Sequence, residues 1–154
     1  MIGSPPYLTR AAREADIDAL VGLMAAFYAE SGYALDADWA TASFRTLLAQ
    51  PTLGAVWLAQ ADHGAVGHAV LTVRHAMEFG GPLGVVDDLY VAPAWRRRGI
   101  AGALLDALRG ECRSRGCKAW QVEVGADNAG AQALYRRFGF APVSSARQLQ
   151  CAGL

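Results

Sequence analysis

The chain has 154 residues, about the length of one ordinary domain, and we expect a single domain over residues 1–154. Its composition, 53% hydrophobic and 18% charged, excludes global disorder. Fourteen basic residues balance fourteen acidic ones, so no overall charge attracts the chain to nucleic acid or to an anionic membrane. We therefore expect neither kind of partner.

Apolar stretches and cysteine usage indicate a cytoplasmic location. The longest strongly apolar stretch, Ala19–Ala29, is far shorter than the roughly 18 residues that a membrane-spanning helix needs. The first ten residues, MIGSPPYLTR, lack the apolar run of a signal peptide. Three cysteines without a C-x-x-C pair favour neither a disulfide framework nor a zinc site. The three histidines have no recognised ligand spacing either, and no metal is expected.

Hydrophobic spacing predicts a short strand and two helices in the first third of the chain. Residues Tyr7–Ala11 suit a strand. Apolar side chains in Ile17–Tyr28 recur at helical spacing, and the preceding Asp16 can cap that helix. A second helix is expected over Asp36–Gln50, because Pro51 ends it.

Three runs of β-type sequence follow. Ala55–Ala61 and Ala65–His75 are joined by Asp62-His63-Gly64, which is typical of a hairpin turn. Gly80-Gly81-Pro82 then interrupts the chain before a third run, Leu83–Val91. We expect three consecutive strands.

The last third alternates helices and strands. We expect a helix over Ile100–Arg115, a strand over Lys118–Val124, a short helix over Ala129–Phe138 and a last strand over Pro142–Leu149. The complete order is β-α-α-β-β-β-α-β-α-β. This order predicts an α/β or α+β fold with a mixed sheet.

One segment has the features of a phosphate-binding site. A strand ends at Val91, and a loop with three arginines and Gly99 leads directly into the helix that begins at Ile100. The first amides of a helix have no intrahelical partner and lie at the positive end of its dipole, so they bind phosphate groups. Gly99 permits close approach of a ligand, and the small Ala101 and Gly102 keep the first turn uncrowded. The glycine motifs of nucleoside-triphosphate and dinucleotide sites are absent.

The same loop and its flanks carry a known signature. Arg96-x-x-Gly99-x-Ala101 fits the pattern [QR]-x-x-G-x-[GA], and Leu89-Tyr90-Val91-x-Pro93 precedes it. Downstream lies Asn128-x-x-Ala131-x-x-Leu134-Tyr135-x-x-Phe138-Gly139-Phe140. In order and spacing these segments resemble the GNAT superfamily of N-acetyltransferases. The resemblance covers essentially the whole chain, although residues 1–50 match in pattern rather than in motif.

The resemblance implies a GNAT fold, with four helices on a mixed sheet of about six or seven strands, and acetyl-CoA as cosubstrate. The fourth strand would separate from the fifth and leave backbone groups at Leu89–Val91 for the pantetheine arm and the thioester carbonyl. Asn128 matches an Asn that often contacts the CoA arm, and it can also cap the last helix. The implied cofactor-binding residues are Leu89, Tyr90, Val91, Arg96, Arg97, Arg98, Gly99, Ile100, Ala101, Gly102, Asn128 and Tyr135.

Transfer of an acetyl group to an amine needs two proton movements. The attacking nitrogen must lose a proton, and the departing thiolate must gain one. Tyr135 matches the family tyrosine that commonly serves as general acid. Glu123, in V-E-V-G-A-D-N, resembles the general base of the ribosomal-protein alanine N-acetyltransferases, and we take it as the base. Asp87 and Asp88 are the alternative.

The acidic pair Asp87 and Asp88, in V-D-D-L-Y-V, resembles the pair with which diamine acetyltransferases hold a cationic substrate. Neighbours on a strand face opposite ways, so both can line one cleft only if the strand contains a bulge. Tyr28 and Tyr33 lie where this family usually covers the acceptor, and we expect them to contact substrate. Trp39 lies in the same region, and for this residue core packing is the alternative interpretation.

The resulting hypothesis is acetyl transfer from acetyl-CoA to a primary amine of a small cationic acceptor, such as a polyamine or an amino-sugar antibiotic, in a ternary complex. The alternatives are acetylation of a protein or peptide N-terminus, and a catalytically silent acyl-CoA-binding module. The resemblance also implies a homodimer, formed through a sheet edge or through Val143–Leu149.

Overall fold

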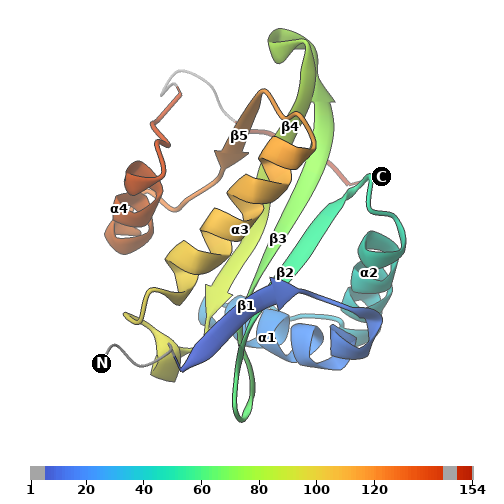
Figure 1. The fold of residues 1–154 in the computed structure, drawn as a ribbon, viewed down its shortest axis with the longest axis vertical. Helices are drawn as coiled ribbons and strands as arrows, with labels where there is room; N and C mark the ends of the chain where they lie inside the picture. Colours follow the sequence, from blue (N-terminus) through green and yellow to red (C-terminus); the bar gives the residue numbers. More distant parts are fainter. Residues whose placement is uncertain (1–5, 144–148, 154) are drawn as a thin grey trace. The chain divides into compact units, whose positions relative to one another are not determined.

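The computed structural model describes residues 6–143 and 149–153 (Figure 1). Contacts between residues group the chain into two compact units, Met1–Glu123 and Val124–Leu154. In the described part of the chain, no helix is both long and apolar enough to cross a lipid bilayer.

The first unit is built on one five-stranded sheet. Its strands, in spatial order, are β1 (Tyr7–Ala11), β2 (Gly54–Ala61), β3 (Gly64–Ala76), β4 (Gly81–Val91) and β5 (Ala119–Val122). The first four strands are antiparallel neighbours, whereas β5 joins β4 in parallel. The prediction of an α+β fold with a mixed sheet is therefore confirmed.

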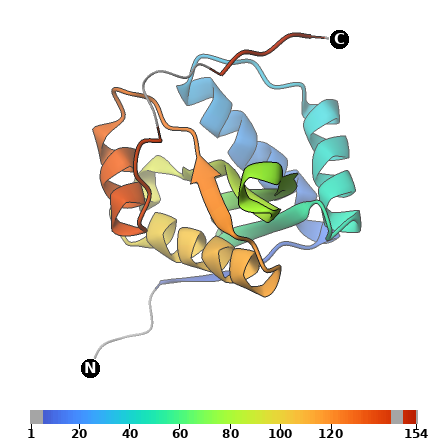
Figure 2. The ribbon, with the colours of Figure 1, turned by 90° about the horizontal axis from the view of Figure 1, so that it is seen from above.

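Three helices cover the two faces of this sheet (Figure 2). They are α1 (Ile17–Glu30), α2 (Ala37–Ala49) and α3 (Ile100–Ser114). The helices α1 and α2 lie on one face and α3 lies on the other. Asp36 caps α2 by accepting a hydrogen bond from the Trp39 amide at 2.9 Å, which fixes the start of the helix where the sequence predicts it.

Each face of the sheet buries its own apolar cluster. Between α1, α2 and the sheet, the buried side chains are Ile17, Leu20, Phe44, Val56, Leu58 and Val70. On the opposite face, α3 contributes Ile100, Leu104, Leu105 and Leu108, all essentially inaccessible. Each such side chain contributes about 1.5–3 kcal/mol relative to its exposed state, so the two clusters hold the strands rigidly between the helices.

The second unit contains α4 (Ala129–Arg137). The Asn128 side chain accepts a hydrogen bond from the Ala131 amide at 3.1 Å, so the predicted N-cap is confirmed. Immediately before it, Gly125-Ala126-Asp127-Asn128 forms a turn closed by a hydrogen bond from the Asn128 amide to the Gly125 carbonyl at 3.0 Å.

Two strand predictions need correction. The strand expected over Lys118–Val124 is shorter, Ala119–Val122, because the turn-forming sequence from Gly125 follows so closely. In the described residues the sheet has five strands rather than six or seven. The strand expected over Pro142–Leu149, which was also the segment suggested for dimerisation, lies largely outside the described residues, because 144–148 are not among them.

Candidate active site

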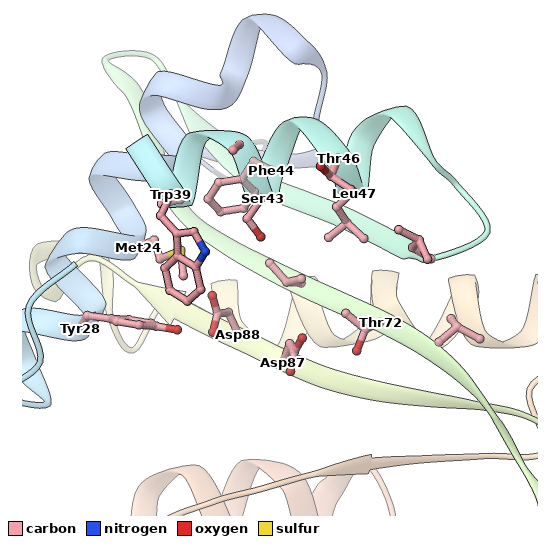
Figure 3. A pocket seen from close by; sticks show the side chains of 15 residues that line it. Met24, Tyr28, Trp39, Ser43, Phe44, Thr46, Leu47, Thr72, Asp87 and Asp88 are labelled. Atoms are coloured by element: carbon pink, nitrogen blue, oxygen red, sulfur yellow. The ribbon is translucent and has the colours of Figure 1, made fainter. Parts of the chain in front are cut away.

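A pocket of about 720 Å³ opens beside α2, over the central strands of the sheet (Figure 3). We call it the acidic pocket. Its lining residues are Met24, Tyr28, Trp39, Ala40, Ala42, Ser43, Phe44, Thr46, Leu47, Leu53, Val70, Thr72, Val73, Asp87 and Asp88. Among these described residues the only charged side chains are the two aspartates, and none is basic. The pocket therefore combines aromatic walls with negative charge.

A β-bulge in β4 places both aspartates on the floor of this pocket. In the register between β3 and β4, Val70 pairs with Asp88 while the next residue, Leu71, pairs with Val86. Asp87 is thus the extra residue, and it points to the same face as Asp88 (Figure 3). The sequence predicted that both aspartates could line one cleft only if the strand contained a bulge, and β4 contains one.

The negative charges on the floor of the acidic pocket contribute to raised pKa values in the groups around them. The pKa of Asp87 is raised, first by desolvation and then by the charges of Asp88 and Glu123, against an interaction with the Thr72 hydroxyl that lowers it. The pKa of Tyr28 is raised by desolvation and by the same two aspartates. A cation that enters the pocket relieves this repulsion, and the ring faces of Tyr28 and Trp39 add cation–π attraction.

The walls of the pocket differ from the sequence expectation at two aromatic residues. Trp39 is 70% exposed and lines the pocket, so of the two interpretations of this residue the core position is the one that the structure does not support. It lies near the start of α2, and its ring is directed toward Asp88 (Figure 3). Tyr28 lines the pocket as expected, whereas Tyr33 is 69% exposed and is not one of the lining residues.

The end of β4 has one unpaired edge. The pairing of β4 with β5 ends at Val86 and Val122, so in the described structure β5 does not extend beside the last residues of β4. The carbonyl of Tyr90 faces β3, because a Cβ atom built on Gly67 would lie 2.9 Å from it. Groups of Leu89 and Val91 consequently face the open edge. This geometry agrees with the separation of strands that the family resemblance implies.

The loop after β4 brings two left-handed residues in front of α3. Arg97 has φ of 63° and Gly99 has φ of 81°. Only glycine adopts such a conformation without strain, which explains Gly99 at the N-cap of α3. Ile100, Ala101 and Gly102 form the first turn of α3, so their amides belong to the set that lacks intrahelical partners.

Arg96 and Arg98 of this loop make different contacts. Arg96 forms an ion pair with Glu30 of α1, and its Nε donates to the carbonyl of Val91 at 2.9 Å. The guanidinium of Arg98 lies 4.8 Å from the ring centroid of Trp95. Any anion bound here would therefore rely on backbone amides, together with the exposed side chains of Arg97 and Arg98.

Glu123 directly follows β5 and is exposed. It lies two residues after Gln121, which pairs with Val85 on β4, and its charge contributes to the raised pKa of Asp87. The structure therefore brings the predicted base into electrostatic range of the acidic pair.

The second unit holds the predicted general acid. Tyr135, in α4, is buried, and its ring packs edge-to-face against Phe140 with 5.5 Å between centroids. Desolvation raises the pKa of Tyr135, which keeps the phenol protonated at neutral pH. Asn128 is in the same unit, where its side chain is engaged in capping α4.

Sequence comparisons agree with these features. The profile of the acetyltransferase (GNAT) family matches residues 18–140. An aminoglycoside N(6')-acetyltransferase type 1 of Stenotrophomonas maltophilia is 35% identical over 91 residues, which cover 56% of this chain and 60% of that protein. The match thus spans about three fifths of the length of this curated relative.

Two solved structures have the same arrangement over nearly the whole chain. An integron cassette protein from the mobile metagenome of Cole Harbour Salt Marsh is 38% identical, with a TM-score of 0.83, over 95% of this chain and 90% of that chain. The aminoglycoside N-acetyltransferase AAC(6')-Iy, solved in complex with CoA, is 22% identical, with a TM-score of 0.82, over 99% and 98%. At that identity the second likeness shows the fold alone.

Proposed function

Because this chain belongs to the acetyltransferase (GNAT) family, we propose that it transfers an acetyl group from acetyl-CoA to a primary amine of a small cationic acceptor. The observation that carries the proposal is the floor of the acidic pocket, where the bulge in β4 turns Asp87 and Asp88 to the same side. The pairing of β4 with β5 ends at Val86, and Asp87 and Asp88 are the next two residues of β4. The acceptor would thus be held beside the strand edge that binds the thioester.

The residues present fit acetyl-CoA on two grounds. The open edge of β4 offers backbone groups of Leu89 and Val91 to the pantetheine arm, and one of these amides would polarise the thioester carbonyl. The left-handed loop and the first turn of α3 offer amides to the pyrophosphate. When bound, acetyl-CoA supplies the activated acetyl group; the chain's own residues bind and orient it.

The proton movements are assigned to Glu123 and Tyr135. The aspartates hold the ammonium form of the acceptor, and Glu123 takes one proton from it so that the nitrogen gains a lone pair. The new N–C bond forms as the C–S bond breaks, and Tyr135 gives its phenolic proton to the departing sulfur. The nitrogen then loses its second proton, which returns to the tyrosinate, so that a neutral amide and a free thiol leave. The raised pKa of Tyr135 supports this role, because a phenol that stays protonated is available as an acid.

The acceptor class follows from charge and size. A pocket with two carboxylates and aromatic walls suits a compact molecule with more than one ammonium group, such as a polyamine or an aminoglycoside. The similarity to aminoglycoside N(6')-acetyltransferases supports the second of these. A peptide N-terminus carries a single ammonium group and would use only part of this negative charge.

The test is acetylation by the purified protein. Acetyl-CoA is mixed separately with kanamycin, spermidine, spermine and peptides that begin with alanine or serine, and thiol release is followed together with the mass of each product. We expect release with at least one of the multivalent amines, a product heavier by one acetyl group, and much weaker release with the peptides. Preference for the peptides would contradict the proposed acceptor class, and no turnover with any amine would favour a silent binding module.

A further inference from the structure

A fully buried histidine lies beside the acidic floor, on the face of the sheet that α1 and α2 cover. His68, on β3, has no exposed surface, and in the described structure neither of its ring nitrogens has a hydrogen-bond partner. Its Nε2 lies 3.7 Å from Oδ2 of Asp88, whose side chain is 12% exposed. Asp88 therefore connects a buried imidazole to the pocket, because the same carboxylate also lines the pocket wall.

The other contacts of His68 are aromatic or apolar. Phe44 of α2 and Tyr90 of β4 each place a ring centroid 6.3 Å from the imidazole, and Leu58 is its cross-strand neighbour on β2. The titratable or charged groups around the pair are Asp87 and Tyr90 on β4, Tyr28 and Glu30 on α1, and Arg96 beyond β4. Glu30 is occupied by Arg96 and by the Tyr90 hydroxyl, which leaves Asp88 as the carboxylate that meets His68.

We propose that His68 is a proton-sensitive positioning residue for Asp88, and that protonation of His68 cancels the charge with which Asp88 holds a cationic acceptor. An imidazole buried without polar partners strongly disfavours a proton unless a carboxylate compensates for it. Asp88 is that carboxylate. The proton and the acceptor's ammonium group therefore compete for one negative charge. This inference rests on the proposed function only for the identity of the cation.

Linkage fixes the direction of both effects. If protonation of His68 weakens acceptor binding, then a bound acceptor must oppose that protonation by the same coupling free energy. Primary amines of polyamines and aminoglycosides remain mostly protonated below neutral pH. Loss of acceptor affinity on acidification therefore comes from the protein, and it is confined to the Michaelis constant of the acceptor, because the carboxylate binds ground and transition states alike.

The direct experiment follows the imidazole of His68 by NMR between pH 5 and 8, without acetyl-CoA. His63→Gln and His75→Gln assign the signal, since both residues are exposed. The proposal requires that the His68 signal of the wild type respond to pH. Its midpoint should move to lower pH in Asp88→Asn, which leaves the cation uncompensated, and also on addition of spermidine or kanamycin. A signal that does not titrate, or that ignores Asp88→Asn, would overturn the proposal.

The kinetic experiment compares the acceptor's KM at pH 7.5 and 5.5. In the wild type we expect KM to rise about fivefold on acidification, the size of one partly screened ion pair, with little change in the KM of acetyl-CoA. In His68→Gln the rise should be largely absent, whereas His75→Gln, on the same strand but exposed, should keep it. Asp87→Asn should also keep it, which separates His68 from the raised pKa of Asp87. An unchanged rise in His68→Gln would contradict the proposal.

The NMR titration of the wild-type protein tests the proposed role of His68 even if the His68→Gln variant does not fold. It also separates the two proposals. A midpoint that responds to Asp88→Asn but to neither amine would support the His68–Asp88 pair and contradict the proposed acceptor class.

Discussion

Arg96, the first residue of the acyl-CoA signature, is held by Glu30 at the end of α1. Its Nη2 lies 2.7 and 2.8 Å from the two carboxylate oxygens of Glu30, and its guanidinium lies 5.7 Å from the ring centroid of Tyr90. The signature arginine thus ties the loop before α3 to a helix that borders the acidic pocket. A substitution of Glu30 should therefore loosen the loop before α3.

The first prediction concerns this tie. Both side chains are more than two fifths exposed, so the ion pair should add little to global stability. Glu30→Gln should leave the melting temperature nearly unchanged but weaken acetyl-CoA binding by on the order of threefold, because the loop loses an anchor. Calorimetric titration measures this. Asp106→Asn, which removes an exposed ion pair with Arg109 within α3, is the matched control and should have no effect on binding.

A second prediction tests the binding site for CoA. Gly99 has φ of 81°, so Gly99→Val imposes a β-branched side chain on a left-handed conformation and adds bulk at the first turn of α3. The dissociation constant of acetyl-CoA should rise at least tenfold, about 1.4 kcal/mol. Gly110→Ala, in the middle of the same helix with open space around it, should bind normally. Normal binding by a folded Gly99→Val protein would rule out this site.

The third prediction isolates the general acid. Tyr135→Phe removes one hydroxyl and should lower kcat by about 10²–10⁴-fold while the dissociation constant of CoA changes little. Because burial raises the pKa of Tyr135, its proton is lost only above the ordinary value near 10, so kcat should not decline on the alkaline side until that range is passed. Steady-state kinetics from pH 6 to 10.5 measure both effects. A normal kcat in Tyr135→Phe would remove the tyrosine from the mechanism.

A fourth prediction separates the base from the residues that hold the acceptor. Glu123→Gln should lose most activity at low pH, where the acceptor is fully protonated and most needs a base, and should be partly rescued at high pH by free amine. Asp88→Asn should instead raise mainly the KM of the acceptor. The two pH–rate profiles provide the measurement. If Glu123→Gln kept the wild-type profile while Asp88→Asn lost kcat, the two roles would have to be exchanged.

The fifth prediction concerns folding stability in acid. Hydrogen bonds from Arg10 lower the pKa of Asp16 from 3.8 to about 2, and the Arg13 amide contributes further, against desolvation that raises it. Because the folded value is the lower one, the stabilisation is fully present above about pH 4 and is lost as the pH falls through 2. At pH 7 it amounts to about 2 kcal/mol. Asp16→Asn should lower the free energy of unfolding in urea by about this amount, and the difference from wild type should vanish near pH 2.

Local chemistry made much of the fold predictable. Asp36 and Pro51 delimit α2 because a cap and a helix breaker act on their immediate neighbours. The helix after Gly99 and the hairpin around Asp62-His63-Gly64 are likewise encoded within a few residues. The acyl-CoA signature predicted the loop in front of α3 because it, too, lies within a few consecutive residues.

The acidic pocket depends on contacts that spacing does not encode. The bulge at Asp87 is set by how β4 pairs with β3, so the sequence could only state that a bulge was required. The apolar spacing of α2 suggested a core position for Trp39, but the helix meets the sheet through its neighbours Ala40 and Phe44. His68 meets Asp88 twenty residues along the chain, across two strands, and only a pairing register reveals that contact.

The single extra residue in β4 also affects how relatives of this chain should be aligned. Before the bulge, Gly84 faces α3, where a Cβ atom would meet Cys112, and Val86 shares that side. After it, Asp88 and Tyr90 face α1 and α2, so the inside–outside alternation reverses within one strand. A homologue that lacks the extra residue would keep regular alternation through β4 and would turn one carboxylate, rather than two, toward the pocket. A one-residue gap at this position would therefore mark the loss of one of the two pocket carboxylates.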